Sequence, residues 1–238
     1  WQVYCRQSNE MTTKYLKSLL DKLNKNKTNG LIQLRPLTKT VDFAKVWTKK
    51  PKPTDIISHP DGPYNFYFIK NLDGLYVATV LDMSSDLHWF VDKKHRRQGH
   101  LTIAMKEVIL FHLFQDRKEQ RVTIDENQIG EEDFTASRNA ALSIGFVKSD
   151  NSDYIITNNK YKTENIIVGQ DTQLTEERLN ELTKQINYFG RSLWLIQSEI
   201  EMKLGETDYA KELKVLVDEI KKHTWRLEDA WFKSKKTS

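Results

Sequence analysis

One segment, residues 87–114, constrains the fold of this chain more than any other. It opens with a short apolar run (Leu87 to Val91), continues through a basic turn with one glycine, Gly99, and enters a stretch with helical apolar spacing. A strand, a turn and a helix in immediate succession bring unpaired helical N–H groups and the positive end of the helix dipole to one corner. Further positive charge comes from the basic residues of the turn, Lys93, Lys94, His95, Arg96 and Arg97. The segment therefore predicts an anion site that suits a pyrophosphate.

The composition is that of a folded chain with little net charge. The chain has 238 residues, of which 38% are hydrophobic and 11% aromatic, and its net charge is +4. This length suffices for one domain with an appendage or for two small domains. So small a net charge argues against a nucleic-acid-binding protein.

Cysteine usage and hydropathy indicate the compartment. The single cysteine, Cys5, excludes an intramolecular disulfide and a cysteine zinc site, and we interpret it as an incidental free thiol. No apolar run approaches the roughly 20 residues of a membrane-spanning helix, and no signal peptide is recognised. We therefore expect a cytoplasmic protein that does not contact a membrane.

The chain divides into three zones, residues 1–30, 31–162 and 163–238. The first is a helical lead-in, because Met11, Tyr15, Leu19 and Leu23 recur every four residues. The middle zone alternates strand and helix patterns. Its strands are expected over residues 31–37, 64–70, 75–81, 87–91 and 121–125, its helices over residues 41–47, 101–114 and 136–144, and a closing hairpin over residues 146–161.

The third zone carries two heptad patterns. The first seam consists of Leu179, Leu182, Ile186, Phe189, Leu193, Ile196 and Ile200, and the second of Tyr209, Leu213, Leu216, Ile220, His223, Leu227 and Ala230. Because Gly205 separates them by only a few residues, the two helices should form an antiparallel hairpin. Such a hairpin cannot bury both flanks of its stripe alone. Its expected partner is the N-terminal helix or a second copy of the chain, and Trp225, Trp231 and Phe232 either pack against that helix or anchor a protein partner.

The order of elements in residues 31–161 resembles the GCN5-related N-acetyltransferase superfamily. Its signature turn reads here Arg96-Arg97-Gln98-Gly99-His100-Leu101, in which Arg96 and Gly99 match and Leu101 departs from the usual Gly or Ala. The resemblance implies an α/β fold with a mixed central sheet flanked by helices, and acetyl-CoA as cosubstrate. It also implies that the cofactor contacts Val91, Arg96, Arg97, Gln98, Gly99, His100, Leu101 and Ser137.

A second family landmark is the pair Gly145-Phe146 after a short helix. Two positions depart from the pattern. Ala141 stands where many members have a tyrosine that reprotonates the leaving thiolate, and Phe134 stands where many have an asparagine. The resemblance therefore does not assign the catalytic acid.

Acetyl transfer to an amine requires a base for the amine, a polarised carbonyl and a proton for the thiolate. We predict His88 and Asp86 as the basic groups, with Asp82 as a further candidate, because they lie beside the strand that precedes the turn. Tyr154 is the predicted acid, and Ser137 and Ser143 are the other hydroxyls nearby. The loop at residues 59–62 is expected on the acceptor side, and no metal site is expected.

Three functions compete at this point. The first is an acyl-CoA-dependent N-acyltransferase whose amine acceptor stays open among small amines, amino acids, peptide N-termini, protein lysines and aminoacyl-RNA. The alternative, favoured by Ala141, is a catalytically weak or inactive CoA-binding domain that serves as an assembly module through its helical arms. The third is nucleic-acid binding by the basic turn, which the near-neutral charge and the absence of interleaved aromatic residues disfavour.

Overall fold

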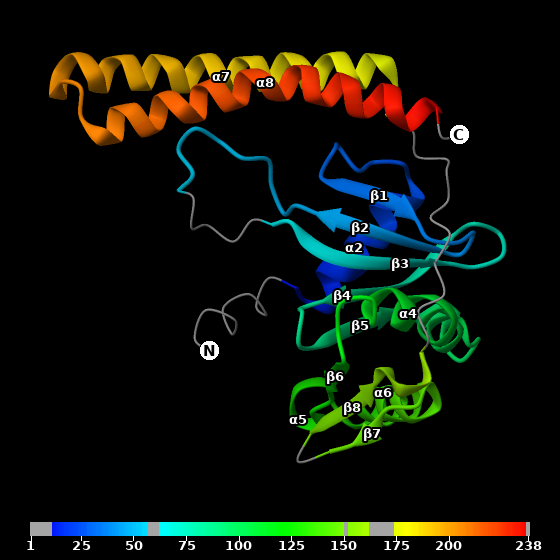
Figure 1. Ribbon diagram of the computed structural model, residues 1–238. Helices are drawn as coiled ribbons and strands as arrows, with labels where there is room; N and C mark the ends of the chain where they lie inside the picture. The colour runs from blue at the N-terminus through cyan, green and yellow to red at the C-terminus, as the bar shows by residue number, and fades with distance from the viewer. Residues whose placement is uncertain (1–10, 57–61, 150–151, 162–173, 237–238) are drawn as a thin grey trace. The chain divides into compact units, whose positions relative to one another are not determined.

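The computed structural model describes residues 11–56, 62–149, 152–161 and 174–236 (Figure 1). Cys5 and residues 59–61 of the expected acceptor loop lie outside these ranges. The chain forms two compact units, Trp1–Gly169 and Gln170–Ser238. Within the described ranges, no helix combines the length and the apolar character that crossing a bilayer requires.

A five-stranded sheet forms the core of the first unit. Its neighbours follow chain order and are all antiparallel: β1 (Ile32–Pro36), β2 (Val41–Val46), β3 (Tyr64–Lys70), β4 (Tyr76–Asp82) and β5 (Leu87–Val91). The prediction of a helix over residues 41–47 is wrong, because this segment is β2. Its main chain pairs with β1 on one edge and β3 on the other, and such pairing overrides a weak local preference.

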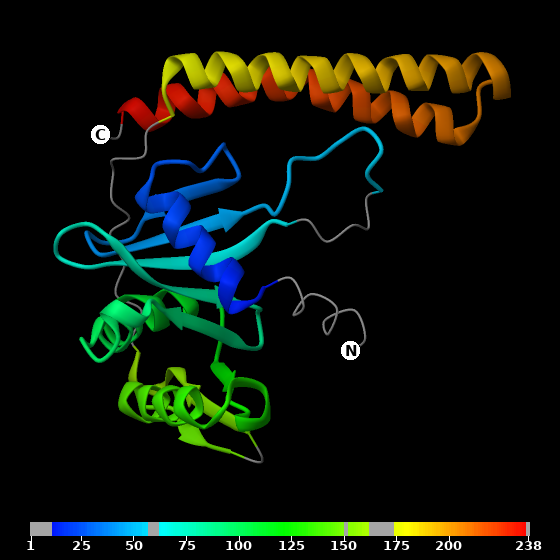
Figure 2. The same cartoon turned by 180° about the vertical axis from the view of Figure 1, so that it is seen from behind.

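Helix α2 (Thr13–Asn24) covers one face of this sheet (Figure 2). The Thr12 hydroxyl caps its first turn by accepting the N–H of Tyr15 at 3.2 Å. The buried leucines of the helix, Leu16, Leu19, Leu20 and Leu23, share a core with sheet residues that include Phe66 and Phe68. The apolar stripe of α2 is thus used within the first unit, which corrects the expectation that it packs against the C-terminal hairpin.

The predicted helix over residues 101–114 is confirmed on the other side of the core. It runs without a break through α3 (His100–Ala104), a π-helical turn (Met105–Ile109) and α4 (Leu110–Leu113). Met105, Ile109 and Leu110 are fully buried and belong to a second core cluster. The continuity of this helix anchors its N-terminus, where the basic turn enters.

A smaller antiparallel sheet completes the first unit in the order β6 (Glu119–Thr123), β8 (Asp153–Thr157) and β7 (Val147–Lys148). The predicted closing hairpin is therefore confirmed as β7 and β8. Helices α5 (Glu126–Ile129) and α6 (Glu131–Ile144) connect β6 to β7. Among the described residues, the two sheets join through one parallel bridge between Asp86 and Arg121. Instead of one mixed sheet, the unit has two antiparallel sheets that diverge between β5 and β6.

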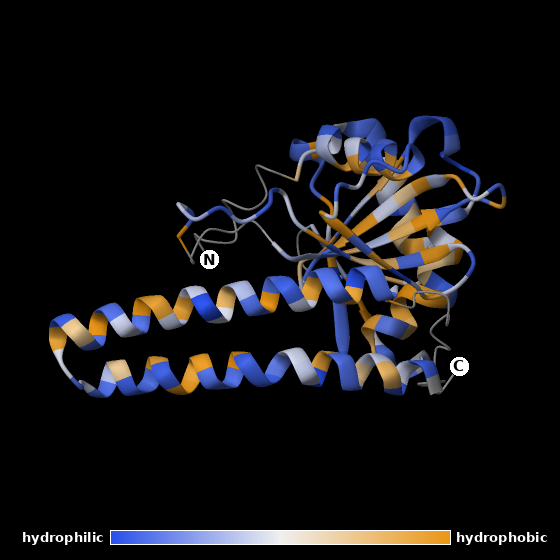
Figure 3. Ribbon diagram, turned by 90° about the horizontal axis from the view of Figure 1, so that it is seen from above, coloured by the Kyte–Doolittle hydropathy of each residue, from blue (hydrophilic) through white to orange (hydrophobic). Residues whose placement is uncertain are grey.

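The second unit is the predicted antiparallel hairpin, formed by α7 (Glu176–Leu204) and α8 (Asp208–Lys236) (Figure 3). Its contact differs from the predicted seam. Phe189, Ile196, Tyr209 and Leu216 are 62%, 52%, 59% and 53% exposed. The residues buried on the two helices are Leu179 and Leu213 of the predicted seams, together with six residues outside them: Gly190, Gln197, Ala210, Val217, Thr224 and Trp231.

Gly190 explains the altered seam. A Cβ atom at this position would lie 3.0 Å from Cγ2 of Ile220, so the absence of a side chain lets α8 approach α7 closely. Trp231 fastens the open end of the hairpin, because its indole Nε1 donates a hydrogen bond to the carbonyl oxygen of Leu174. Trp225 and Phe232 are 72% and 57% exposed, so they do not share this packing role.

Candidate functional site

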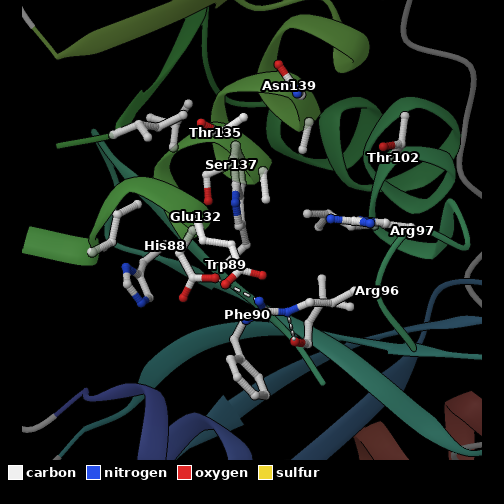
Figure 4. A pocket seen from close by; sticks show the side chains of 18 of the residues that line it. His88, Trp89, Phe90, Arg96, Arg97, Thr102, Glu132, Thr135, Ser137 and Asn139 are labelled. Carbon is white, nitrogen blue, oxygen red and sulfur yellow. Dashed lines mark hydrogen bonds and ion pairs between the residues drawn. The ribbon is translucent and has the colours of Figure 1, made fainter. Parts of the chain in front are cut away.

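A pocket of about 1360 Å³ lies where β5 and β6 diverge (Figure 4). Its walls are β5, the basic turn with the first residues of α3, the end of β6 and the first turns of α6. Typical small-molecule pockets occupy about 300–1,000 Å³. This one therefore has room for a ligand larger than most metabolites. We call it the wedge pocket.

The β5 wall offers unpaired main-chain groups. Asp92 donates its N–H to Val77 O at 2.9 Å, and Met83 donates its N–H to Asp86 O at 3.0 Å. These two bonds show which residues of β5 direct their main-chain groups toward β4. Because antiparallel strands alternate in this way, the N–H and C=O groups of Trp89 and Val91 point away from β4. Among the described residues, neither N–H of this pair has an acceptor. The edge of β5 can therefore bind an extended ligand that carries amides.

The basic turn ends in a left-handed residue, Gly99, with φ +80°. The first helical bond runs from Ile103 N–H to Gly99 O, so the N–H groups of residues 99–102 precede the helical ladder. They have no acceptor within the described residues. Side chains brace the turn, since Gln98 Nε2 donates to Lys94 O at 3.2 Å and Gln98 Oε1 lies 3.1 Å from His100 Nε2. Free N–H groups at the start of a long helix are the arrangement that binds anions at helix N-termini.

Seven of the eight predicted cofactor residues line the wedge pocket. They are Val91, Arg96, Arg97, Gly99, His100, Leu101 and Ser137. Gln98 is the exception, because its side chain is engaged within the turn itself. The local sequence thus places its residues together, with Ser137 joining them from α6.

Carboxylates face the basic turn across the wedge pocket. Glu131, Glu132 and Asp133 form the first turn of α6, where the helix dipole stabilises negative charge. Arg96 Nη1 donates to Asp133 Oδ1 at 2.7 Å, and Arg96 Nε lies 3.4 Å from Val91 O. The pocket consequently holds both signs of charge, and sequence reasoning missed the acidic side. The available signal was the run of three acids directly after Gly130.

The proposed base, His88, lines the wedge pocket. Burial lowers the pKa of this imidazole below its ordinary value of 6.5, while the nearby Asp86 carboxylate acts in the opposite direction. The side chain is therefore neutral near pH 7 and able to accept a proton.

Asp86 itself does not line the pocket but joins the two sheets. Its Oδ1 accepts the N–H groups of Leu87 and Thr123, each at 2.9 Å. Burial raises the pKa of this carboxyl, and the hydrogen bonds from Thr123 partly offset that effect. Asp86 therefore links the start of β5 to the end of β6.

The hydroxyl and carboxylate candidates are spread over the unit. Tyr154 is 3% exposed in the core, opposite Val122 and Lys148, and is not part of the pocket lining. Asp82 is bound by Arg117, whose Nη1 and Nη2 lie 2.9 and 2.7 Å from its two oxygens. Ser143 is exposed on α6 outside the lining, and Ala141 is fully buried.

The lining also contains polar and aromatic residues that were not predicted. They are Trp89, Phe90, Lys93, His95, Thr102, Thr123, Thr135 and Asn139. In the described part of the chain, no cluster of three or more His, Cys, Asp or Glu side chains is arranged to hold a metal ion. No protein-family model, curated protein or solved structure matches this chain. Its geometry and chemistry alone therefore bear on its function.

Proposed function

We propose that this chain is an acetyl-CoA-dependent N-acetyltransferase of the GCN5-related type. The observation that carries the proposal is the wedge pocket at the divergence of β5 and β6, with an N–H-rich basic turn at one end. Coenzyme A combines a pyrophosphate with an extended arm that carries two amides. The pocket offers a complementary group for each of these features.

The pyrophosphate would bind at the basic turn. The N–H groups of residues 99–102 would donate to phosphate oxygens, and Arg97 would supply charge from the pocket wall. The pantetheine arm would lie along β5 as an added strand, with its amides against the main chain of Trp89 and Val91. This placement brings the thioester to the His88 end of β5.

The reaction would proceed by direct attack of the acceptor amine on the thioester carbonyl carbon. His88 takes a proton from the amine, directly or through a water molecule, and an N–H of β5 stabilises the negative oxygen. The C–N bond forms, the C–S bond breaks, and the acetyl group leaves with the amine. Because Tyr154 is not part of the pocket lining, we assign protonation of the thiolate to water.

Release of free thiol from acetyl-CoA, measured against a panel of amines, tests this proposal. We expect release that depends on the amine and falls in a His88→Ala variant. A protein that binds no coenzyme A would contradict it.

A second candidate is a CoA-binding module with little turnover. It is favoured by Ala141, which is fully buried at the position where many family members have a catalytic tyrosine. Tight acetyl-CoA binding without thiol release for any amine would select this function over the first.

A further inference from the structure

The hairpin of the second unit carries a second apolar stripe beside its internal contact. Four exposed side chains each precede a buried residue of that contact by one position: Phe189, Ile196, Tyr209 and Leu216 precede Gly190, Gln197, Ala210 and Val217. One residue along a helix corresponds to a rotation of about 100°. Because α7 and α8 run in opposite directions, a shift of one residue toward the N-terminus on each helix turns both stripes to the same side of the hairpin. These four residues, together with Ile220 and Leu227, define what we call the front face.

A hollow of about 470 Å³ confirms that both helices contribute to the front face. It is lined by Ile186 and Phe189 of α7 and by Ile220, His223, Arg226 and Leu227 of α8. The exposed side chains Ile196, Tyr209 and Leu216 lie nearer the helix connection at residues 205–207. The front face therefore has an apolar ridge toward the connection and an apolar hollow toward the middle of the hairpin.

We infer that a second copy of this chain covers the front face, so that two hairpins form an antiparallel four-helix bundle. A two-fold axis through the face reverses the second hairpin and brings its ridge toward the hollow of the first. Such an isologous contact needs one surface that complements itself, which the ridge and hollow provide. Apolar side chains that fill holes between facing helices are the packing mode of such bundles.

The size of the front face agrees with a stable dimer. Each helix has 29 residues, which corresponds to a length of about 43 Å, and two adjacent helices span about 20 Å. One whole side of the hairpin therefore has a footprint of roughly 860 Å² per copy, which is large enough to contain a standard interface of roughly 800 Å² per partner.

The N-terminal helix is already engaged elsewhere. The leucines of α2 are at most 4% exposed and lie against the five-stranded sheet of the first unit. This inference does not depend on the proposed acetyltransferase activity, because none of its residues lines the wedge pocket.

The test is the mass of the full chain in solution, measured by light scattering and sedimentation. We expect two copies for the natural sequence. A variant with Phe189→Glu and Ile196→Glu should be monomeric, with a dissociation constant raised at least about a hundredfold, because charges buried in apolar surroundings are strongly disfavoured. Its helicity by circular dichroism should stay unchanged, since both positions are exposed within one hairpin.

The matched control replaces the residues that precede these two on the same helix. Tyr188→Glu with Leu195→Glu changes side chains that are 68% and 72% exposed but point about 100° farther from the hairpin contact. This control should remain a dimer. If the first pair reduces helicity, Tyr209→Ser with Leu216→Ser on α8 takes its place. A monomeric natural chain, a larger assembly, or a dimer that survives both front-face variants would overturn the inference.

Discussion

Arg96 and Asp133 form an ion pair across the wedge pocket, with 2.7 Å between Nη1 and Oδ1. Arg96 belongs to the turn after β5, whereas Asp133 lies in the first turn of α6. Their side chains are 30% and 46% exposed, so water screens the attraction. Ion pairs of this kind contribute about 0.2–1 kcal/mol. An incoming phosphate can therefore displace the carboxylate and take its place beside Arg96.

The first prediction concerns this competition. Asp133→Asn should tighten acetyl-CoA binding by about twofold to fivefold, because Arg96 is released and a negative charge near the phosphates is removed. The control is Asp153→Asn, which affects a comparable pair with Arg121 outside the pocket. Calorimetric titration of both variants provides the measurement. Weaker binding by Asp133→Asn would mean that the carboxylate holds Arg96 in its binding position.

The second prediction concerns the pH dependence of acetyl transfer. The base must be neutral, and burial lowers the pKa of His88 below 6.5. The rate should therefore hold as the pH falls through 6.5 and decline only below the lowered pKa. In His88→Gln, turnover should drop about a hundredfold, and the decline of the rate at low pH (the acid limb of the profile) should disappear.

His112→Gln is the matched control for that experiment. His112 is also a histidine whose pKa burial lowers, but its Nδ1 lies 2.7 Å from the Tyr67 hydroxyl and it is not part of the pocket lining. This variant should retain the acid limb. An unchanged pH profile in His88→Gln would exclude His88 as the base.

The third prediction concerns the thiolate. Tyr154→Phe should change turnover much less than the roughly hundredfold expected for a dominant general acid, because Tyr154 lies in the core. Steady-state thiol release is the measurement. A loss well beyond a hundredfold in a variant with unchanged thermal stability would identify Tyr154 as the acid after all.

The fourth prediction concerns stability. Arg117→Met should reduce the free energy of unfolding by about 3–5 kcal/mol, because the Asp82 side chain is 3% exposed and would lose its charged partner. Arg96→Met removes an ion pair with a half-exposed aspartate and should change the free energy of unfolding by less than about 1 kcal/mol. Urea denaturation distinguishes the two. Equal effects would show that the Asp82 pair is not buried in solution.

Elements defined by local signals were predictable from the sequence. The β-rich runs at residues 64–70 and 75–81 predicted β3 and β4, and the segment around Gly99 predicted β5, the turn and the long helix. Strand β2 was missed because its short segment gains its conformation from two neighbouring strands. Part of the hairpin seam was misplaced because Phe189 and Ile196, which are apolar, each precede by one position a residue that is buried although it is not a large apolar one, Gly190 and Gln197. Which stripe faces inward depends on the close approach at Gly190.

The candidate site shows the same division. The basic turn and the β5 wall are contiguous in sequence, so one segment predicts them together. Asp133 lies 37 residues after Arg96, and only the return of the chain through β6 and α5 brings them into contact. Tyr154 was predicted by its chemistry, and no sequence signal shows that its side chain lies in the core.

The central claim is that the turn at Gly99 binds the pyrophosphate of acetyl-CoA, and titration of a Gly99→Glu variant by calorimetry tests it most directly. Gly74→Glu is the matched control, because Gly74 has φ +81° against +80° for Gly99 and lies in a hairpin turn away from the pocket. Both changes add the same strain and the same charge. The account predicts that Gly74→Glu binds acetyl-CoA like the natural chain and that Gly99→Glu does not bind it measurably. Equal affinities in the two folded variants would contradict it.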